Sequence, residues 1–361
     1  MTHKERTLTA INHQEPDRVP ICAWYTPEAE KKMLKYFGMD TSQIETYKSS
    51  GGPLPIKMGH DFLITWIGPC TSYYAEDSPE YIDEWGIGWK WFKNPSGGSY
   101  TEIVYHPLAK DNDLSKLHIP DFSDDKRYED SKKMIAEYGG EYAIMGGVAC
   151  TLFELAWYLR GLEKFMEDML VNKDYAHELL DRLITWVLIA GKKLIELGVD
   201  IIWIGDDAGM QDRMLIHPKL WREFLKPRYA RIFSEFRKVN PNIKIAFHSD
   251  GYIEPIIPDF IEIGLDILNP VQPKSMDPAR LKKLYGDKLT FWGCVDVQEV
   301  LPFGTPEDVE KEVKLRIQTV GKGGGFLLAP AHNIQPDVKI ENILAFYRAA
   351  EKYGRYPLKL G

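Results

Sequence analysis

Three side chains that could bind a metal or transfer a proton follow two short apolar runs of the sequence. His248 and Asp250 come after the run 243–247, and His332 comes after the run 326–329. Short apolar runs are typical of buried strands, and parallel α/β folds place their chemistry beyond the carboxyl ends of strands. Residues two apart on an extended segment point the same way, so His248 and Asp250 can face one target.

These three residues suit zinc, which binds imidazole nitrogen and carboxylate oxygen and keeps one position open in catalytic sites. A metal-free interpretation stays open on the same residues. In that case His248, Asp250 and His332 act as acid, base and hydrogen-bond donors.

Further acids lie near other strand ends. Asp206 and Asp207 follow the apolar run 201–205, and one of two adjacent acids on a strand end must point inward. A helix cap or a salt bridge is the alternative role. Glu154 lies one helical turn past the run 142–146 and could reach the same site, or it could be a first-turn acid favoured by the helix dipole.

Amide and aromatic side chains near these strand ends could bind a substrate. The amides are those of Asn269, Gln272 and Asn333. The aromatic side chains are those of Trp24, Tyr25 and Tyr73. Loop hydrogen bonding and core packing are the alternative roles of these residues.

The elements that must position these residues are apolar runs alternating with amphipathic stretches such as 176–197, 218–238 and 306–320. This alternation is typical of repeated βα units. We predict a (β/α)8 TIM barrel that forms a single domain over residues 1–361. The expected strands are 19–24, 62–66, 142–146, 201–205, 243–247, 267–269, 289–293 and 326–329.

The segment 70–106 is rich in Trp, Tyr, Gly and Pro. Glycine-containing turns between aromatic runs favour antiparallel pairs, so we predict a hairpin insertion over the barrel mouth. We expect this insertion to form one wall of an aromatic pocket, with Trp24 or Tyr25 on another.

Composition limits the partners and the compartment. A net charge of -8 and a pI near 5.7 disfavour binding to nucleic acid or to an anionic membrane. No window approaches the ~20 apolar residues of a membrane helix. The 4 cysteines form no CxxC pair, which argues against a disulfide framework and a zinc ribbon. We expect a cytoplasmic protein, and the sequence is compatible with a homo-oligomer.

Several segments resemble the uroporphyrinogen decarboxylase superfamily, which includes the cobalamin-dependent methyltransferases. The likeness runs from Glu-Pro-Asp-Arg-Val-Pro at 15–20 to Leu-Ala-Pro-Ala-His-Asn at 328–333. It is most specific in Leu-Asn-Pro-Val-Gln at 268–272, in Phe-Trp-Gly at 291–293 and in Leu-Pro-Phe-Gly-Thr-Pro at 301–306. The resemblance implies a (β/α)8 barrel with its site in the mouth.

The chain departs from both branches of this superfamily. The decarboxylases carry an N-terminal arginine-rich motif for their polycarboxylate substrate, whereas residues 25–30 here read Tyr-Thr-Pro-Glu-Ala-Glu. The methyltransferases bind zinc through His-x-Cys and a later Cys, and the matching residues here are His248, Asp250 and His332. Replacing both thiolates gives a harder ligand set, which suits an oxygen substrate such as a methyl ether.

The resemblance and its departures favour a methyltransferase of the O-demethylase type. The methyl group would move from an O-methylated, aromatic small-molecule donor to the Co(I) of a separate corrinoid protein, because no corrinoid-binding His motif is evident here. Asp206, Asp207 or Glu154 would supply the proton or a fourth metal ligand. The alternatives are a decarboxylase of a small carboxylic acid, with Asp207 or His332 as proton donor, and an inactive barrel acting as a binding protein.

Overall fold

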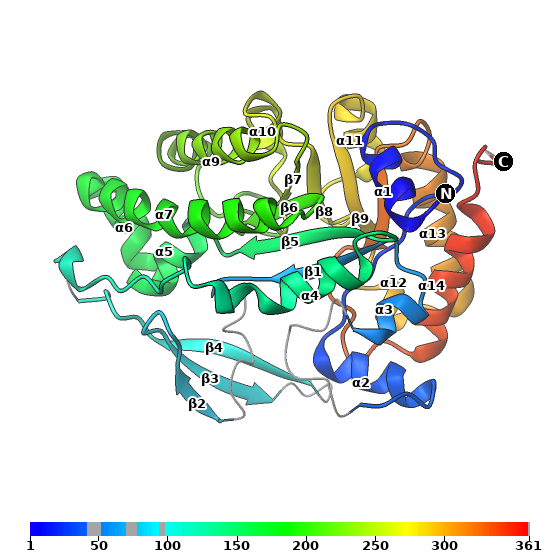
Figure 1. Cartoon of the computed structure of the whole chain (residues 1–361), viewed down its shortest axis with the longest axis horizontal. Coiled ribbons are helices and arrows are strands. Elements are labelled where there is room, and N and C mark those ends of the chain that lie inside the picture. The colour runs from blue at the N-terminus through cyan, green and yellow to red at the C-terminus, as the bar shows by residue number, and fades with distance from the viewer. Residues whose placement is uncertain (42–51, 70–77, 94–97, 111, 360–361) are drawn as a thin grey trace.

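A curled parallel sheet forms the centre of the molecule (Figure 1). The computed structural model describes residues 1–41, 52–69, 78–93, 98–110 and 112–359. Seven strands pair in the order β1-β5-β6-β7-β8-β9-β10, and each neighbouring pair is parallel. They are β1 (Phe62–Trp66), β5 (Ala143–Ala149), β6 (Ile201–Gly205), β7 (Lys244–His248), β8 (Ile267–Val271), β9 (Thr290–Val295) and β10 (Phe326–Pro330). This arrangement confirms the predicted TIM-barrel-like fold.

The eighth strand position, between β10 and β1, is filled by an irregular segment over residues 19–25. Ile21 and Tyr25 form isolated parallel bridges with Leu328 and Ile334. On the other side, the amide of Asp61 donates to the carbonyl of Ile21 at 2.9 Å. The expected strand 19–24 therefore occupies the predicted position in the barrel, but it pairs with its neighbours only through isolated bridges.

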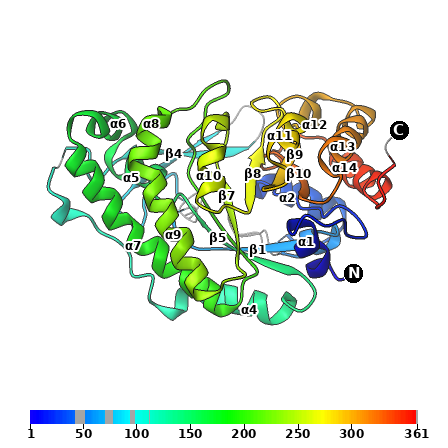
Figure 2. The same ribbon diagram turned by 90° about the horizontal axis from the view of Figure 1, so that it is seen from above.

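Helices surround the strands. Figure 2 shows α7 beside α9 at one side of the sheet and α13 beside α14 at the other. Among the described helices, none combines the length and the apolar composition that crossing a bilayer requires. The helices are α1 (His3–Ile11), α2 (Pro27–Tyr36), α3 (Pro53–Lys57), α4 (Glu129–Tyr138), α5 (Phe153–Arg160), α6 (Leu162–Val171), α7 (Lys173–Leu197), α8 (Pro218–Leu220), α9 (Lys226–Val239), α10 (Ile257–Glu262), α11 (Pro278–Tyr285), α12 (Val300–Phe303), α13 (Pro306–Val320) and α14 (Ile340–Tyr353).

The sequence explains where these helices begin and end. Helix α13 begins with a capping box, in which the side chains of Thr305 and Asp308 bond each other's backbone amides. Helix α7 buries one face of its 25 residues and ends at Gly198, whose φ of 101° is accessible to glycine. Local capping and a single apolar face thus fix the helices that flank the sheet.

The insertion forms a second, antiparallel sheet of three strands, lying apart from the parallel sheet in Figure 1. Its strands are β2 (Glu80–Ile82), β3 (Gly88–Lys93) and β4 (Ser99–Tyr105). The amide of Ser99 donates to Glu28 of α2 at 3.0 Å, which ties the sheet to the helix that follows the segment 19–25. The prediction of antiparallel pairing is confirmed, and the structure adds a third strand.

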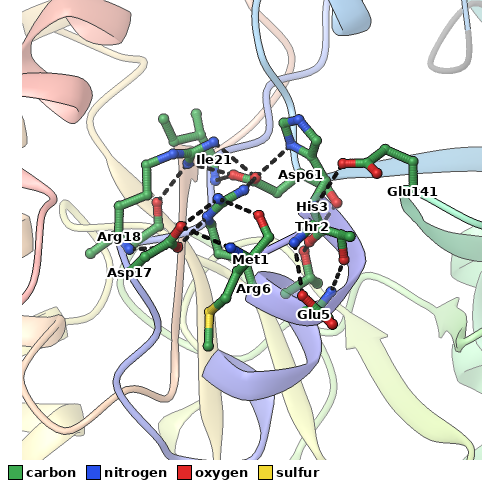
Figure 3. A network of polar contacts seen from close by, with 12 residues as sticks. Met1, Thr2, His3, Glu5, Arg6, Asp17, Arg18, Ile21, Asp61 and Glu141 are labelled. Atoms are coloured by element: carbon green, nitrogen blue, oxygen red, sulfur yellow. Dashed lines mark hydrogen bonds and ion pairs between the residues drawn. The ribbon is translucent and has the colours of Figure 1, made fainter.

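A buried carboxylate at the amino end of β1 joins the N-terminal helix to the barrel (Figure 3). Asp61 accepts hydrogen bonds from Arg6 at 2.8 Å, from Arg18 at 2.7 and 2.9 Å and from the amide of Ile21 at 2.7 Å. Oδ1 of Asp61 also lies 2.8 Å from Nδ1 of His3. Burial alone would raise the pKa of Asp61, but hydrogen bonds from His3 and Arg18 hold it below its ordinary value.

Candidate metal centre

The side chains of His248, Asp250 and His332 converge beyond the ends of β7 and β10. Nε2 of His248 lies 3.8 Å from Oδ1 of Asp250, and Nε2 of His332 lies 3.5 Å from Oδ2 of Asp250. One ligand atom from each residue lies within 4.8 Å of the other two. A tetrahedral zinc ion holds its ligands ~3.4 Å apart, so these separations approach those of a coordination sphere.

Asn269 fixes the orientation of the His248 ring. Its Oδ1 accepts a hydrogen bond from the indole of Trp203 at 3.2 Å, and an indole can only donate. The atom that lies 2.7 Å from Nδ1 of His248 is therefore an acceptor, and Nδ1 carries the hydrogen. In the neutral ring the lone pair is then on Nε2, the nitrogen that faces the carboxylates of Asp207 and Asp250. Metal-binding histidines are oriented in this way by their second nitrogen.

The backbone and side chain of Asp250 are also held in place. Nε2 of Gln272 donates to Oδ1 of Asp250 at 3.2 Å, and Oε1 of Gln272 accepts from the amide of Gly251 at 2.7 Å. The neighbouring strand allows the close approach, because a Cβ at Gly205 would lie 2.5 Å from the Cβ of His248. Gly205 therefore keeps the space that His248 occupies.

Asp207 faces the same point as the three converging residues. Its Oδ1 lies 3.8 Å from Nε2 of His248 and accepts from the amide of Asp250 at 2.8 Å. Burial and the charge of Asp250 raise the pKa of Asp207. A cation bound between the two acids would relieve this repulsion. The donor set of His248, Asp250 and His332 therefore fits a divalent ion, and the carboxylate of Asp207 lies beside it.

Asp206 points away from this cluster and into a buried network. Its carboxylate accepts from the hydroxyls of Thr151 and Tyr229 and from the amides of Leu152 and Glu154, which begin helix α5. Burial raises the pKa of Asp206 to about 6, and these hydrogen bonds oppose the rise. The structure thus places Asp206 as a cap for α5, the alternative role that the sequence left open.

Glu154 is buried, with 8% of its surface exposed. Burial first, and the charges of Asp207 and Asp206 second, raise the pKa of Glu154 well above its ordinary value. Its carboxyl accepts a hydrogen bond from the hydroxyl of Tyr158 at 2.9 Å. The surroundings of Glu154 therefore favour its protonated form, and Asp207 is the charged neighbour that acts on it most strongly.

The remaining predicted site residues divide between the mouth and the surrounding structure. Trp24 lies at the mouth, with its ring centroid 6.4 Å from that of His248, and it lines a small hollow with His332 and Asn269. Tyr25 points elsewhere, because its hydroxyl bonds that of Tyr347 at 2.6 Å. Asn333 is buried after His332, and Tyr73 lies outside the described residues.

A larger cavity adjoins the cluster, between the insertion and helices α5 and α6. Its volume is about 460 Å³. We call it the insertion cavity; it is lined on the sheet by Trp89, Thr101, Glu102, Ile103 and His106, and on the helices by Glu154, Trp157, Tyr158 and Leu162. The insertion thus forms one wall as expected, but α5 and α6 form the other, in place of Trp24 or Tyr25. Sequence reasoning missed Trp157 and Tyr158, although they follow Glu154 in the same helix.

The comparison with known protein families identifies the chain. The family model described as uroporphyrinogen decarboxylase (URO-D) matches residues 95–353. The chain belongs to this family.

Among its curated relatives, this URO-D family chain is similar to a methylated-thiol--coenzyme M methyltransferase of Methanosarcina mazei. They are 24% identical over 203 residues, covering 55% of this chain and 51% of the relative. The match thus spans about half the length of that relative. The chain is also 24% identical over 280 residues to a uroporphyrinogen decarboxylase of Legionella pneumophila, covering 75% of each.

The fold of the URO-D family chain has a counterpart among solved structures. A methyltransferase from Methanosarcina mazei superposes with a TM-score of 0.74 at 21% identity, covering 98% of this chain and 99% of that one. This likeness extends over the whole length and shows the fold.

Proposed function

We propose that this protein transfers a methyl group from an aromatic methyl ether to the Co(I) of a corrinoid held by a separate protein. The convergence of His248, Asp250 and His332 carries the proposal, because two imidazoles and a carboxylate form a ligand set without sulfur that suits an oxygen substrate. The Methanosarcina mazei methyltransferase relative supports methyl transfer. In this reaction the C–O bond breaks, a Co–C bond forms with the electron pair of Co(I), and the oxygen leaves as a phenol after taking a proton.

In this proposal His248, Asp250 and His332 hold a divalent ion such as zinc. A metal bound there would act as a Lewis acid toward the ether oxygen. The bond from His248 to Asn269 keeps Nε2 available as a ligand. The carboxylate of Asp207 faces His248, so it either binds the ion as a fourth ligand or lies next to the three ligands without binding.

Glu154 supplies the proton that the leaving oxygen requires. Its raised pKa favours the protonated form that a general acid requires. The charge of Asp207 contributes to this rise, so Glu154 lies within electrostatic reach of the cluster. Asp206 has no part in this step, because its carboxylate is occupied by the start of α5.

The lining of the mouth favours methyl transfer over decarboxylation of a polycarboxylate. Among the described residues that line the insertion cavity and the hollow beside Trp24, none is an arginine. A substrate with many carboxylates would therefore lack the bidentate partners that stabilise such charges.

A reconstituted transfer assay tests the proposal. The zinc-loaded protein is mixed with 2-methoxyphenol and a reduced corrinoid protein, and methyl-cobalamin absorbance is followed together with the demethylated product. We expect transfer that disappears after chelation and in His248→Ala, but persists in His118→Ala, which changes an exposed histidine. Carbon dioxide release from a carboxylic acid without corrinoid would instead establish a decarboxylase.

A further inference from the structure

The insertion cavity has the size and the walls of a site for a small aromatic ligand. Its volume of about 460 Å³ lies within the ~300–1,000 Å³ range of small-molecule sites. Trp89 and Ile103 line it from the small sheet, while Trp157, Tyr158 and Leu162 line it from helices α5 and α6. Most of this surface is therefore aromatic or aliphatic.

The aromatic walls are held in fixed orientations. The ring of Tyr158 lies edge-on to those of Trp89 and Trp157, with centroids 5.8 and 4.3 Å away and interplanar angles of 86° and 84°. The indole of Trp89 donates to Asp83 at 2.9 Å. The carbonyl of Tyr158 contacts Nδ1 of His106 at 2.7 Å, which joins the two walls. A flat ring can therefore bind with little reorganisation of the protein.

The lining opposes an anionic ligand. Among its described residues, none is lysine or arginine, and Glu102 and Glu154 contribute carboxyl groups. The imidazole of His106 is engaged, because its Nδ1 contacts the carbonyl of Tyr158 at 2.7 Å. A carboxylate on the ligand would therefore lose its hydration without gaining a lysine or arginine partner.

One lining residue connects the insertion cavity to the cluster of His248, Asp250 and His332. Glu154 lines the cavity and interacts with the charge of Asp207, whose Oδ1 lies 3.8 Å from Nε2 of His248. A ring in the cavity can thus present a substituent toward the barrel mouth.

We propose that the insertion cavity binds the ring of an uncharged methoxyarene and discriminates against methoxybenzoates. This inference rests on the proposed methyl transfer and names its donor class. Specificity comes from the lack of a lysine or arginine among the described lining residues.

Binding measurements on the zinc-loaded protein test the specificity. Tryptophan fluorescence or calorimetry would compare 2-methoxyphenol with 4-methoxybenzoate. We expect the uncharged ligand to bind at least about tenfold more tightly than the benzoate, because the carboxylate must be desolvated without a lysine or arginine partner. Equal or tighter binding of 4-methoxybenzoate would overturn the proposal.

Two variants locate the ligand. Ile103→Trp places a larger side chain in the cavity and should weaken binding of 2-methoxyphenol by at least about tenfold. The matched control is Ile82→Trp, at a site on β2 that is 63% exposed, and it should bind as the wild type does. Unchanged binding in a folded, zinc-loaded Ile103→Trp protein would overturn the cavity assignment.

Separate readouts distinguish failure of this inference from failure of the proposed function. If 2-methoxyphenol binds as described but no methyl group reaches the corrinoid, methyl transfer is refuted while the aromatic site stands. If transfer proceeds equally well in Ile103→Trp, the donor binds elsewhere and the cavity assignment is refuted.

Discussion

Removing the side-chain amide of Asn269 should weaken metal binding without changing any of the proposed ligands. Its Oδ1 contacts Nδ1 of His248 at 2.7 Å and accepts from Trp203 at 3.2 Å, and the residue is 3% exposed. In Asn269→Ala the His248 ring loses the partner that fixes its tautomer and orientation. Loss of such a partner costs about 10–100-fold in metal affinity, or about 1.4–2.7 kcal/mol.

The same change should also lower the stability of the metal-free protein, since two buried donors lose their acceptor. Each unsatisfied donor costs about 1–3 kcal/mol. Asn269→Asp restores an acceptor for both donors, so its zinc affinity should recover to at least the wild-type level.

Zinc affinity is measured by competition with a chromophoric chelator, and thermal unfolding of the metal-free proteins reports stability separately. Asn242→Ala is the matched control, because this exposed asparagine precedes β7 at the opposite end from His248. Wild-type zinc affinity in Asn269→Ala would refute the claim that this amide prepares His248 as a ligand.

Two further predictions concern the buried acids. Asp61→Asn should lower the free energy of unfolding by about 3–5 kcal/mol, because Arg6 and Arg18 lose the charge that compensates them; equal denaturation midpoints would contradict this. The raised pKa of Glu154 implies that its own contribution to wild-type stability is fully present below the ordinary value of 4.5 and is lost as the pH rises through the folded-state pKa. Glu154→Gln lacks this titration, so its Tm relative to wild type should increase with pH above 4.5; a constant difference would show that Glu154 titrates normally.

The sequence predicted the strands well, because each buried strand is encoded by a short run of consecutive apolar residues. The expected run 62–66 matches β1, and 201–205 matches β6. The first expected strand, 19–24, forms only bridges; it contains Pro20, which has no amide hydrogen to donate to a neighbouring strand. The apolar pattern alone does not reveal that Pro20 lacks this hydrogen-bond donor.

The site was predictable where position along a strand decides the geometry. His248 ends β7 and His332 follows β10, and the carboxyl ends of the parallel strands in this curled sheet lie along one rim. The direction of Asp206 was not predictable, because it depends on Thr151 and Tyr229, which are distant in the sequence. Likewise, the wall formed by Trp157 depends on how the insertion packs against α5.

X-ray absorption at the zinc edge tests the central claim most directly, since it reports the atoms that surround the bound ion. For the zinc-loaded wild type we predict nitrogen and oxygen scatterers at about 2.0–2.2 Å, including two imidazoles and no sulfur. His248→Ala should lose one imidazole or lose the metal. Sulfur scattering at about 2.3 Å, or a spectrum that is unchanged in His248→Ala, would contradict the assignment of His248, Asp250 and His332 as the metal centre.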